Sequence, residues 1–317
     1  MKRRSDFAPA LAFLLPNLLG FVLFTAGPVL FSLGASFTNW DLQKSVPFAF
    51  IGVENFRRLF HSEEFWVHLI NTLYLMIGMP FAIAGSLILA LLLSRKLRGM
   101  SFYRTMFYLP TFTYGVALMI LWKKLYNPES GPINAIIDFV LAHLKIHAES
   151  PKWLQSANNL LGLVPQHVQF SRRYFGLGAR DALVNMGVWV AIGGNNMLLY
   201  LAALTNVPQD LYEAAEIDGA GRWQKFWNVT WPQLAPTTFF IIVISCIGGL
   251  QSGFESARIM TEGGPAGTTT TLAYYIYIKA FQEFQMGYAS AIAWVLFAVI
   301  FAVTLVNWRF GTRAVNE

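Results

Sequence analysis

Six long stretches of the chain carry no Asp, Glu, Lys or Arg, and shorter polar segments separate them. They are 18 to 34 residues long and cover 7–40, 69–94, 105–122, 182–209, 229–254 and 284–308. About 20 apolar residues cross a hydrocarbon core as a helix, and buried helices of soluble proteins are usually shorter than these stretches. The pattern therefore predicts an all-α membrane protein with six transmembrane helices.

Composition supports this prediction and argues against a soluble protein. The chain is 55% hydrophobic and 13% charged, whereas a soluble domain carries about 25% charged residues. The first stretch is longer than a signal-peptide core and has no small-residue cleavage site, so we expect an uncleaved span. Basic residues that flank the spans account for the net charge of +6, and no nucleic-acid partner is expected.

The distribution of basic residues predicts which span ends face the cytoplasm. With a cytoplasmic N-terminus, 11 of the 23 Lys and Arg residues fall in the inner segments 1–6, 94–104, 207–235 and 309–317. The short loop SRKLRGMSFYR decides the orientation, because the positive-inside bias acts in short loops. We predict a single integral membrane domain over 1–317 with both termini in the cytoplasm.

Two loops outside the membrane have recognisable parts. The long periplasmic loop, 123–181, is expected to hold a helix from Asn134, and a helix is also expected from Asn55 in the preceding outer loop. The later sequence TEGGPAGTTTT lacks the lysine of a phosphate-binding loop, so we interpret it as a Gly/Pro turn. Basic residues outnumber acidic ones in the loop 123–181, namely Lys145, Lys152, Arg172, Arg173 and Arg180.

Residues 211–236, LYEAAEIDGAGRWQKFWNVTWPQLAP, combine acidic and aromatic side chains between two apolar spans. Pro208 suits the start of a helix, and Asp210 and Glu213 favour the positive end of its dipole. Gly219, within GAG, allows a sharp bend after this helix. We therefore predict a short amphipathic helix followed by a turn.

A second short helix is predicted after the turn. Trp223, Phe226 and Trp227 recur at helical spacing, and Pro232 is expected to end the helix before the fifth span. An acidic face beside exposed aromatic rings suits a groove on a protein better than an anionic membrane surface. The two helices, in an L shape, are thus predicted to form a cytoplasmic docking element over 207–235.

This segment closely resembles the EAA loop of permease subunits in bacterial binding-protein-dependent ABC importers. The loop pattern is E-A-A-x-x-D-G-A, then Phe, then a hydrophobic–Pro pair and a further Pro; it is matched here by Glu213, Ala214, Ala215, Asp218, Gly219, Ala220, Phe226, Pro232 and Pro236. The resemblance extends to GPVLFSLGASFTNW, GVENFRRLF, YRTMFYLP and TEGGPAGTTTTLAYYIYIKAF, and so to most of the chain. These segments are similar to the carbohydrate branch, which includes maltose and glycerol-phosphate permeases.

The resemblance implies a transport subunit of the bacterial cytoplasmic membrane, with no catalytic residue and no cofactor of its own. ATP and Mg²⁺ would bind to the partner ATPase. The implied partners are a second homologous permease subunit in a heterodimer, two ATPase subunits, a periplasmic or lipid-anchored substrate-binding protein, a carbohydrate and membrane lipid. The implied ATPase-coupling residues are Glu213, Ala214, Ala215, Asp218, Gly219, Trp223, Phe226 and Pro232. Among them, Trp223 and Phe226 would be the anchors.

Polar residues near the middle of the fourth and fifth spans are candidates for the substrate path. Amides suit sugar hydroxyls because they offer donors and acceptors together, and an aromatic ring can stack on a sugar ring. The candidates are Trp189, Asn195, Asn196, Gln251 and Ser252, with Tyr200 as a second stacking ring. Hydrogen bonding between helices explains the polar residues equally well.

Other functions stay open at this stage. The basic excess in the loop 123–181, which is longer than usual for this branch over about 158–180, suits an anionic saccharide or glycerol-phosphate-type solute. An ion-coupled secondary transporter would need intramembrane carboxylates, and Glu255 beside Arg258 is the only candidate pair. A membrane enzyme or metal site is not favoured, since His143 and His147 lack an obvious third ligand.

Overall fold

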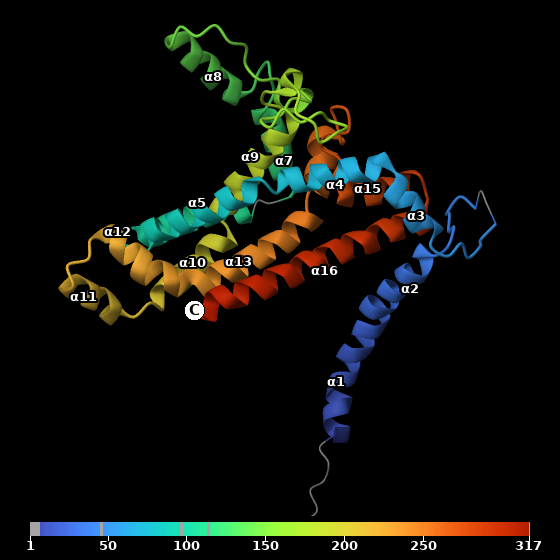
Figure 1. Cartoon of the computed structure of the whole chain (residues 1–317), viewed down its shortest axis with the longest axis horizontal. Helices are drawn as coiled ribbons and strands as arrows, with labels where there is room; N and C mark the ends of the chain where they lie inside the picture. Colours follow the sequence, from blue (N-terminus) through green and yellow to red (C-terminus); the bar gives the residue numbers. More distant parts are fainter. Residues whose placement is uncertain (1–6, 45–46, 96–97, 113–114, 317) are drawn as a thin grey trace, which may run out of the picture. The chain divides into compact units, whose positions relative to one another are not determined.

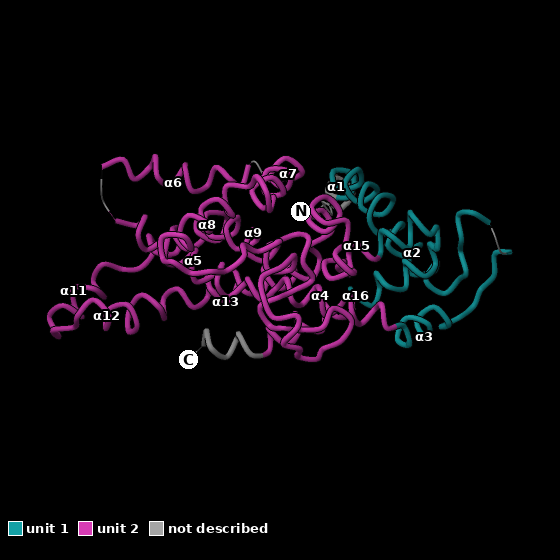
Figure 2. The backbone as a smooth tube through the Cα atoms, turned by 90° about the horizontal axis from the view of Figure 1, so that it is seen from above, with its two compact units in different colours: residues 1–62, 276–297 teal, residues 63–275, 298–317 magenta. Residues whose placement is uncertain are grey.

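The computed structural model describes residues 7–44, 47–95, 98–112 and 115–316. These residues are almost entirely helical and hold three isolated β-bridges. Figure 1 gives the order of the elements, and Figure 2 shows two compact units, which are residues 1–62 with 276–297 and residues 63–275 with 298–317. In the labels below, η marks a short 3-10 or π-helical segment.

The first unit is built on its N-terminal helices. Its elements are α1 (Phe7–Phe21), η1 (Val22–Ala26), α2 (Gly27–Ser36), α3 (Glu54–His61), η7 (Ile278–Gln282) and the first part of α16 (Met286–Asn316). The start of α3 confirms the helix predicted at Asn55. The buried Asn55 amide donates to the carbonyls of Ser36 and Thr38 at 2.9 and 2.8 Å, and so joins α3 to the end of α2.

The second unit holds the rest of the helices. Its elements are α4 (Glu63–Leu75), α5 (Gly78–Leu93), α6 (Met100–Tyr108), η2 (Leu109–Thr111), α7 (Val116–Leu125), α8 (Pro132–His143), η3 (Trp153–Gln155), η4 (Arg172–Tyr174), α9 (Ala179–Ile192), α10 (Asn195–Thr205), α11 (Gln209–Ile217), α12 (Arg222–Lys225), η5 (Phe226–Thr230), α13 (Trp231–Gln251), α14 (Phe254–Ser256), η6 (Ala257–Thr261), most of α15 (Leu272–Tyr277) and the end of α16. The helix predicted at Asn134 is confirmed as α8.

Five helical stretches of the described residues are long and apolar enough to cross a membrane. They are Leu11–Ser36, Glu63–Leu93, Ala179–Thr205, Arg222–Thr261 and Met286–Arg309. Each one coincides with a predicted span. A sixth is reached if the bent pair α6–η2 and α7 is counted as one span. The predicted fold class, an all-α membrane protein with up to six spans, is therefore confirmed.

The span predicted over 105–122 is not one straight helix. Its two halves, Met100–Thr111 and Val116–Leu125, meet at an angle of 94°. Leu109 before Pro110 is still helical, whereas Gly115 has a φ of +118°, outside the helical region. An uncharged run reports length and polarity only, so the sequence pattern did not reveal this bend.

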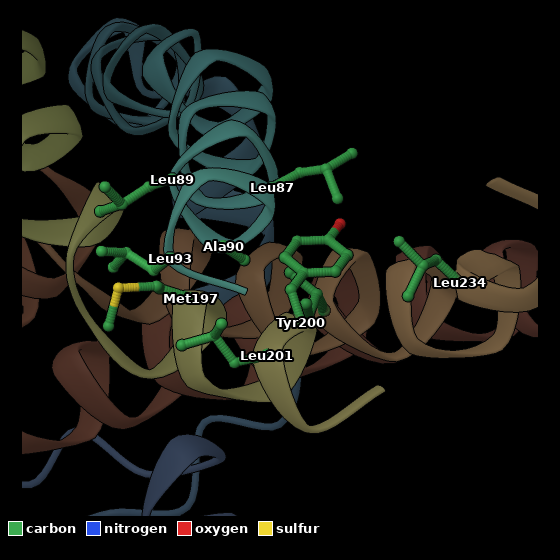
Figure 3. Packing of buried hydrophobic residues seen from close by; sticks show 9 residues of the cluster. Leu87, Leu89, Ala90, Leu93, Met197, Tyr200, Leu201 and Leu234 are labelled. Carbon is green, nitrogen blue, oxygen red and sulfur yellow. The ribbon is translucent and has the colours of Figure 1, made fainter. Parts of the chain in front are cut away.

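The core of the second unit lies where α5, α10 and α13 meet. Figure 3 shows leucines and an alanine of α5 facing Met197, Tyr200 and Leu201 of α10, with Leu234 of α13 beside them. Small residues let α5 approach α9 closely. A Cβ atom at Gly78 would lie 2.7 Å from a Val188 methyl. The small residue at position 78 thus permits the close contact of α5 with α9.

Candidate functional site

The predicted docking element begins with α11 and ends that helix in a tight turn. Gly219 has a φ of +75°, which favours glycine. The N–H of Gly219 donates to the carbonyl of Glu216 at 3.0 Å, and the N–H of Ala220 donates to that of Ala215 at 2.8 Å. This pair of bonds is a Schellman motif, which satisfies carbonyls at the helix end. The Asp-Gly-Ala sequence is thus explained locally as a helix stop.

Side-chain bonds hold α11 against the segment that follows the turn. The Lys225 ammonium contacts the Glu216 carboxylate at 2.5 Å, and the hydroxyls of Tyr212 and Thr230 are 2.9 Å apart. The Gln224 side chain accepts a hydrogen bond from the N–H of Gly221 at 2.7 Å and caps the start of α12. We call the whole of residues 209–230 the coupling segment; its two helices are fixed to each other at two points, Glu216 to Lys225 and Tyr212 to Thr230.

The second helix of the coupling segment does not end at Pro232. Instead α12, η5 and α13 follow one another without a break, and Pro232 lies in the first turn of α13. The reason is the wide π-helical turn of η5, in which the N–H of Trp231 donates to the carbonyl of Phe226. A turn of this kind inserts an extra residue into the helix, which makes room for the proline ring. The predicted stop at Pro232 is wrong.

The coupling segment exposes both charge and apolar surface. The Glu213 and Asp218 carboxylates are exposed, and within the described residues neither has a hydrogen bond or ion pair. Trp223 is 71% exposed, and Ile217, a residue that the sequence analysis did not select, is 87% exposed. Two acidic groups and two large apolar side chains therefore face outward from one short element.

The remaining predicted coupling residues have different surroundings. Phe226 is half-buried and packs against the core of α5, α10 and α13, so its ring points largely into the unit. Ala214 is exposed and Ala215 is half-buried on α11. A ladder of rings, with centroids 5.7 Å apart for Trp223 and Trp227 and 5.8 Å for Trp227 and Trp231, runs along the second helix. The role of these residues in coupling stays a prediction.

A cavity of about 530 Å³ lies between α5, α9, α10 and α13. Three predicted substrate-path residues, Asn195, Asn196 and Ser252, line it together with Ser245. Its lining also includes three methionines and four glycines, namely Met76, Met79, Met186, Gly78, Gly187, Gly248 and Gly249. The Asn195 amide oxygen accepts a hydrogen bond from the Tyr108 hydroxyl at 3.1 Å. The structure thus brings amide and hydroxyl groups to the wall of one largely apolar cavity.

Other substrate-path candidates lie elsewhere. Trp189 lines a separate hollow with Tyr103 and Phe107, and its ring meets that of Trp122 edge to face at 5.5 Å. Gln251 is exposed at the end of α13 and is absent from the cavity lining. Tyr200 is fully buried, with its hydroxyl 3.2 Å from that of Thr238. The proposal that Tyr200 stacks on a sugar ring is therefore wrong.

A buried polar network that the sequence analysis missed centres on Arg180. Arg180 is only 2% exposed and donates to the Thr268 carbonyl at 2.9 Å and the Asn71 amide oxygen at 2.7 Å. Its neighbour Asp181 accepts a bond of 2.6 Å from the Tyr74 hydroxyl. Arg180 is therefore not part of a solvated basic face, as its place in the loop suggested.

The same network explains the threonine-rich turn. Thr268 to Thr271 are buried, and the Asn71 amide donates to the carbonyls of Gly267 and Thr270 at 2.8 and 3.0 Å. The loop after η3 joins in, since the Leu160 N–H donates to the Asp181 carboxylate at 3.2 Å. The interpretation of this sequence as a turn is confirmed, and the turn is part of the interior of the unit.

Residues 78–313 match the family described as the binding-protein-dependent transport system inner membrane component. The chain belongs to this family. Its members here are transport permeases and not enzymes. The match includes α5, the cavity and the coupling segment, and it agrees with the several membrane-length helices of the fold.

Individual relatives cover almost the whole chain. It is 35% identical to the probable ABC transporter permease protein YesP of Bacillus subtilis over 99% of this chain and 93% of that protein. It is 31% identical to the sn-glycerol-3-phosphate transport system permease protein UgpA of Pectobacterium atrosepticum over 99% of this chain and 97% of that protein. A solved bacterial alginate ABC transporter, in complex with alginate pentasaccharide-bound periplasmic protein, contains a chain of the same fold with a TM-score of 0.77, 23% identity and coverage of 98% and 96%.

Proposed function

We propose that this chain is one permease subunit of an ATP-driven importer that carries a carbohydrate across the bacterial cytoplasmic membrane. One observation carries the proposal. The second helix of the coupling segment, which exposes Trp223, runs without a break into α13, and α13 lines the cavity through Ser245, Gly248 and Gly249. The helix α11, which carries the outward carboxylates, is held to this second helix by the bonds of Glu216 to Lys225 and of Tyr212 to Thr230. A surface suited to a protein partner and the wall of the cavity are thus connected by one continuous helix.

This continuity supplies a physical route for coupling. From Arg222 to Gln251 the helical backbone rises about 45 Å at about 1.5 Å per residue. A helix transmits displacement along its axis because its backbone bonds are internal. If a partner ATPase moves the coupling segment when it binds ATP, the cavity wall moves with it. In this proposal ATP hydrolysis takes place in the partner ATPase, which binds ATP and Mg²⁺.

The proposed assembly contains a second homologous permease subunit, two ATPase subunits and a periplasmic or lipid-anchored substrate-binding protein. Both termini and the coupling segment lie in the cytoplasm in this proposal, since the short basic loop 94–104 follows the positive-inside bias. Glu213 and Asp218 are the polar contacts to the ATPase, and Trp223 and Ile217 are its apolar anchors. Phe226 instead holds the second helix against the unit.

A carbohydrate is the substrate class that the cavity chemistry and the relatives support. Asn195, Asn196 and the serine hydroxyls can each donate to and accept from sugar hydroxyls. Relatives are described by names that include multiple sugar-binding transport in Streptococcus mutans and sn-glycerol-3-phosphate transport. An anionic saccharide or a glycerol-phosphate-type solute is the second candidate, favoured by the exposed pair Arg172 and Arg173.

Reversing the charge of Glu213 tests the proposed coupling. We expect Glu213→Lys to insert normally and to assemble with the other permease, yet to lower ATP-dependent uptake at least tenfold, because a carboxylate that binds the ATPase becomes a repelling ammonium. Uptake of labelled sugar into membrane vesicles and the amount of each subunit in the membrane are measured together.

Asp210→Lys is the matched control. Asp210 lies nearer the N-terminus of α11, where a charge acts more strongly on the helix dipole. If Glu213 only stabilises this helix, Asp210→Lys reduces uptake at least as much as Glu213→Lys does. That outcome, or wild-type uptake by Glu213→Lys, contradicts the docking role.

A further inference from the structure

The lining of the cavity includes four glycines that differ in what surrounds them. They are Gly78 on α5, Gly187 on α9, and Gly248 and Gly249 on α13. None of the four has a positive φ, so the backbone conformation does not require glycine at these positions. A glycine in a helix is less stable than an alanine, and each of them therefore needs a reason in its surroundings.

Two of these glycines allow close packing. A Cβ atom at Gly78 would lie 2.7 Å from a methyl of Val188 on α9, and one at Gly249 would lie 3.0 Å from Cγ of Met76, in the turn between α4 and α5. Both distances are shorter than the optimal separation of two carbon atoms, about 3.5–4.0 Å. Gly78 and Gly249 thus let α9 and α13 pack against α4 and α5, the floor of the cavity (Figure 1).

The other two glycines face open space. Beyond the neighbouring backbone of its own helix, a Cβ atom at Gly187 or at Gly248 would have no described heavy atom within 4 Å. Both residues are exposed and line the cavity. Each directly precedes a residue that packs against the floor, Val188 on α9 and Gly249 on α13. On both wall helices, the missing side chain therefore adds room to the cavity and not a packing contact.

The open position on α13 lies among polar groups. Gly248 follows Ser245 by three residues and precedes Ser252 by four, and all three line the cavity. At helical spacing these residues share one face. A solute that bonds to the two serine hydroxyls therefore lies against the bare backbone of Gly248. The methionines of the lining can adapt to such a solute by changing rotamer, whereas a branched side chain at position 248 would occupy its space.

We propose that Gly187 and Gly248 set the size of the saccharide that the cavity admits, an inference that rests on the proposed function of the cavity as the carbohydrate path. The volume of about 530 Å³ lies in the range of pockets for drug-sized ligands. Two bare wall positions add width that a solute as small as glycerol phosphate does not need. The ligand class is therefore an oligosaccharide.

Reaction with a small thiol reagent tests whether both positions stay open in the assembled importer. Small residues also let helices of two subunits approach, so a second permease subunit is the alternative occupant. In a Cys246→Ser background, which removes the only native cysteine, G187C, G248C and G249C are assembled with the partner subunits in nanodiscs. Each is treated with aminoethyl methanethiosulfonate, with and without ATP.

We expect G187C and G248C to react at least tenfold faster than G249C, whose position packs against Met76, in at least one nucleotide state. If G187C and G248C react only after denaturation, another subunit covers them, and the proposal is overturned.

Uptake of saccharides of different lengths tests the size role itself. Vesicles that contain the importer receive a partial hydrolysate of starch, xylan and pectin, and mass spectrometry gives the chain lengths that enter. We expect Gly187→Leu and Gly248→Leu to lower the ratio of the longest to the shortest imported saccharide at least tenfold. Gly20→Leu is the matched control, because a Cβ atom at Gly20 also meets open space but Gly20 lies on α1 and is absent from the cavity lining; it should leave this ratio unchanged.

The outcomes separate this proposal from the proposed function. Equal loss of uptake at every chain length, with normal amounts of each subunit in the membrane, overturns the size role and leaves the importer function standing. An unchanged ratio in Gly187→Leu and Gly248→Leu overturns it as well. If no saccharide enters vesicles that contain the wild-type importer, the proposed function fails, and the size role fails with it.

Discussion

Arg180 shows how a residue in a loop-like, basic context becomes part of the interior. It begins the first turn of α9, where its side chain reaches the Thr268 carbonyl and the Asn71 amide. The guanidinium also lies over the Tyr74 ring at 5.3 Å. One side chain thus ties α9 to α4 and to the threonine-rich turn, which are far apart in the sequence.

Removing this side chain should weaken the whole unit. We expect Arg180→Gln to lower the free energy of unfolding by about 3 kcal/mol, because buried partners of the guanidinium lose their bonds. Arg173→Gln, an exposed arginine of the same loop, should change it by less than about 0.5 kcal/mol. Thermal unfolding of the two variants in the same detergent compares them; equal melting temperatures contradict the structural role of Arg180.

Such residues cannot be found from a single sequence. Arg180 and Arg173 lie in the same outer loop of the sequence, and the approach of α4 and the threonine-rich turn is what buries Arg180. Glu213 and Asp218 could be selected from the sequence, because both belong to the short E-A-A-x-x-D-G-A pattern. Ile217 could have been found too, since an isoleucine between two acidic residues on an exposed short helix has no core to enter.

Among the elements, the turn between α11 and α12 follows most directly from local chemistry. Gly219 and Gly221 stand two residues apart. A Cβ atom would meet open space at Gly219 and an ordinary contact with Gln224 Oε1 at 3.6 Å at Gly221, but only Gly219 has a positive φ. The difference between them is therefore a difference of backbone conformation alone.

We expect Gly219→Ala to destabilise the turn by about 1 kcal/mol, because an L-residue is strained at positive φ. Gly221→Ala should have a much smaller effect. Amide hydrogen exchange over residues 209–230 and sugar uptake are measured for both. If the two variants exchange at the same rate, the left-handed conformation at Gly219 is not what holds the coupling segment in shape.

The lengths of the spans were predictable, and their internal breaks were not. Apolar runs located five helices because a bilayer demands about the same length from each. The bend near Pro110 and the continuation through Pro232 show opposite outcomes for the same residue type. Pro232 follows the π-helical turn η5, whereas Pro110 lies within the 3-10 turn η2. No residue pattern in one sequence specifies that difference.

For the whole molecule, the energy source separates the proposed importer from an ion-coupled transporter. With the partner subunits present, we expect sugar uptake into vesicles to persist when ionophores collapse the proton and sodium gradients and to stop when ATP is removed. The reason is that the coupling segment offers exposed acidic and apolar side chains to an ATPase. Uptake that follows the gradients and ignores ATP contradicts the importer.

The uninterrupted passage from the coupling segment into α13 fixes rotational phase as well as reach. Each residue added to or removed from this helix would turn its far end by about 100° relative to its near end, so Ser245 and Gly249 would leave the cavity while Trp223 kept its place. Side chains on the outer surface of α13 are free to vary within apolar limits. The number of residues between the two ends is not free to vary, because it sets the angle between Trp223 and the residues that line the cavity. Substitutions leave this angle unchanged, whereas insertions and deletions alter it.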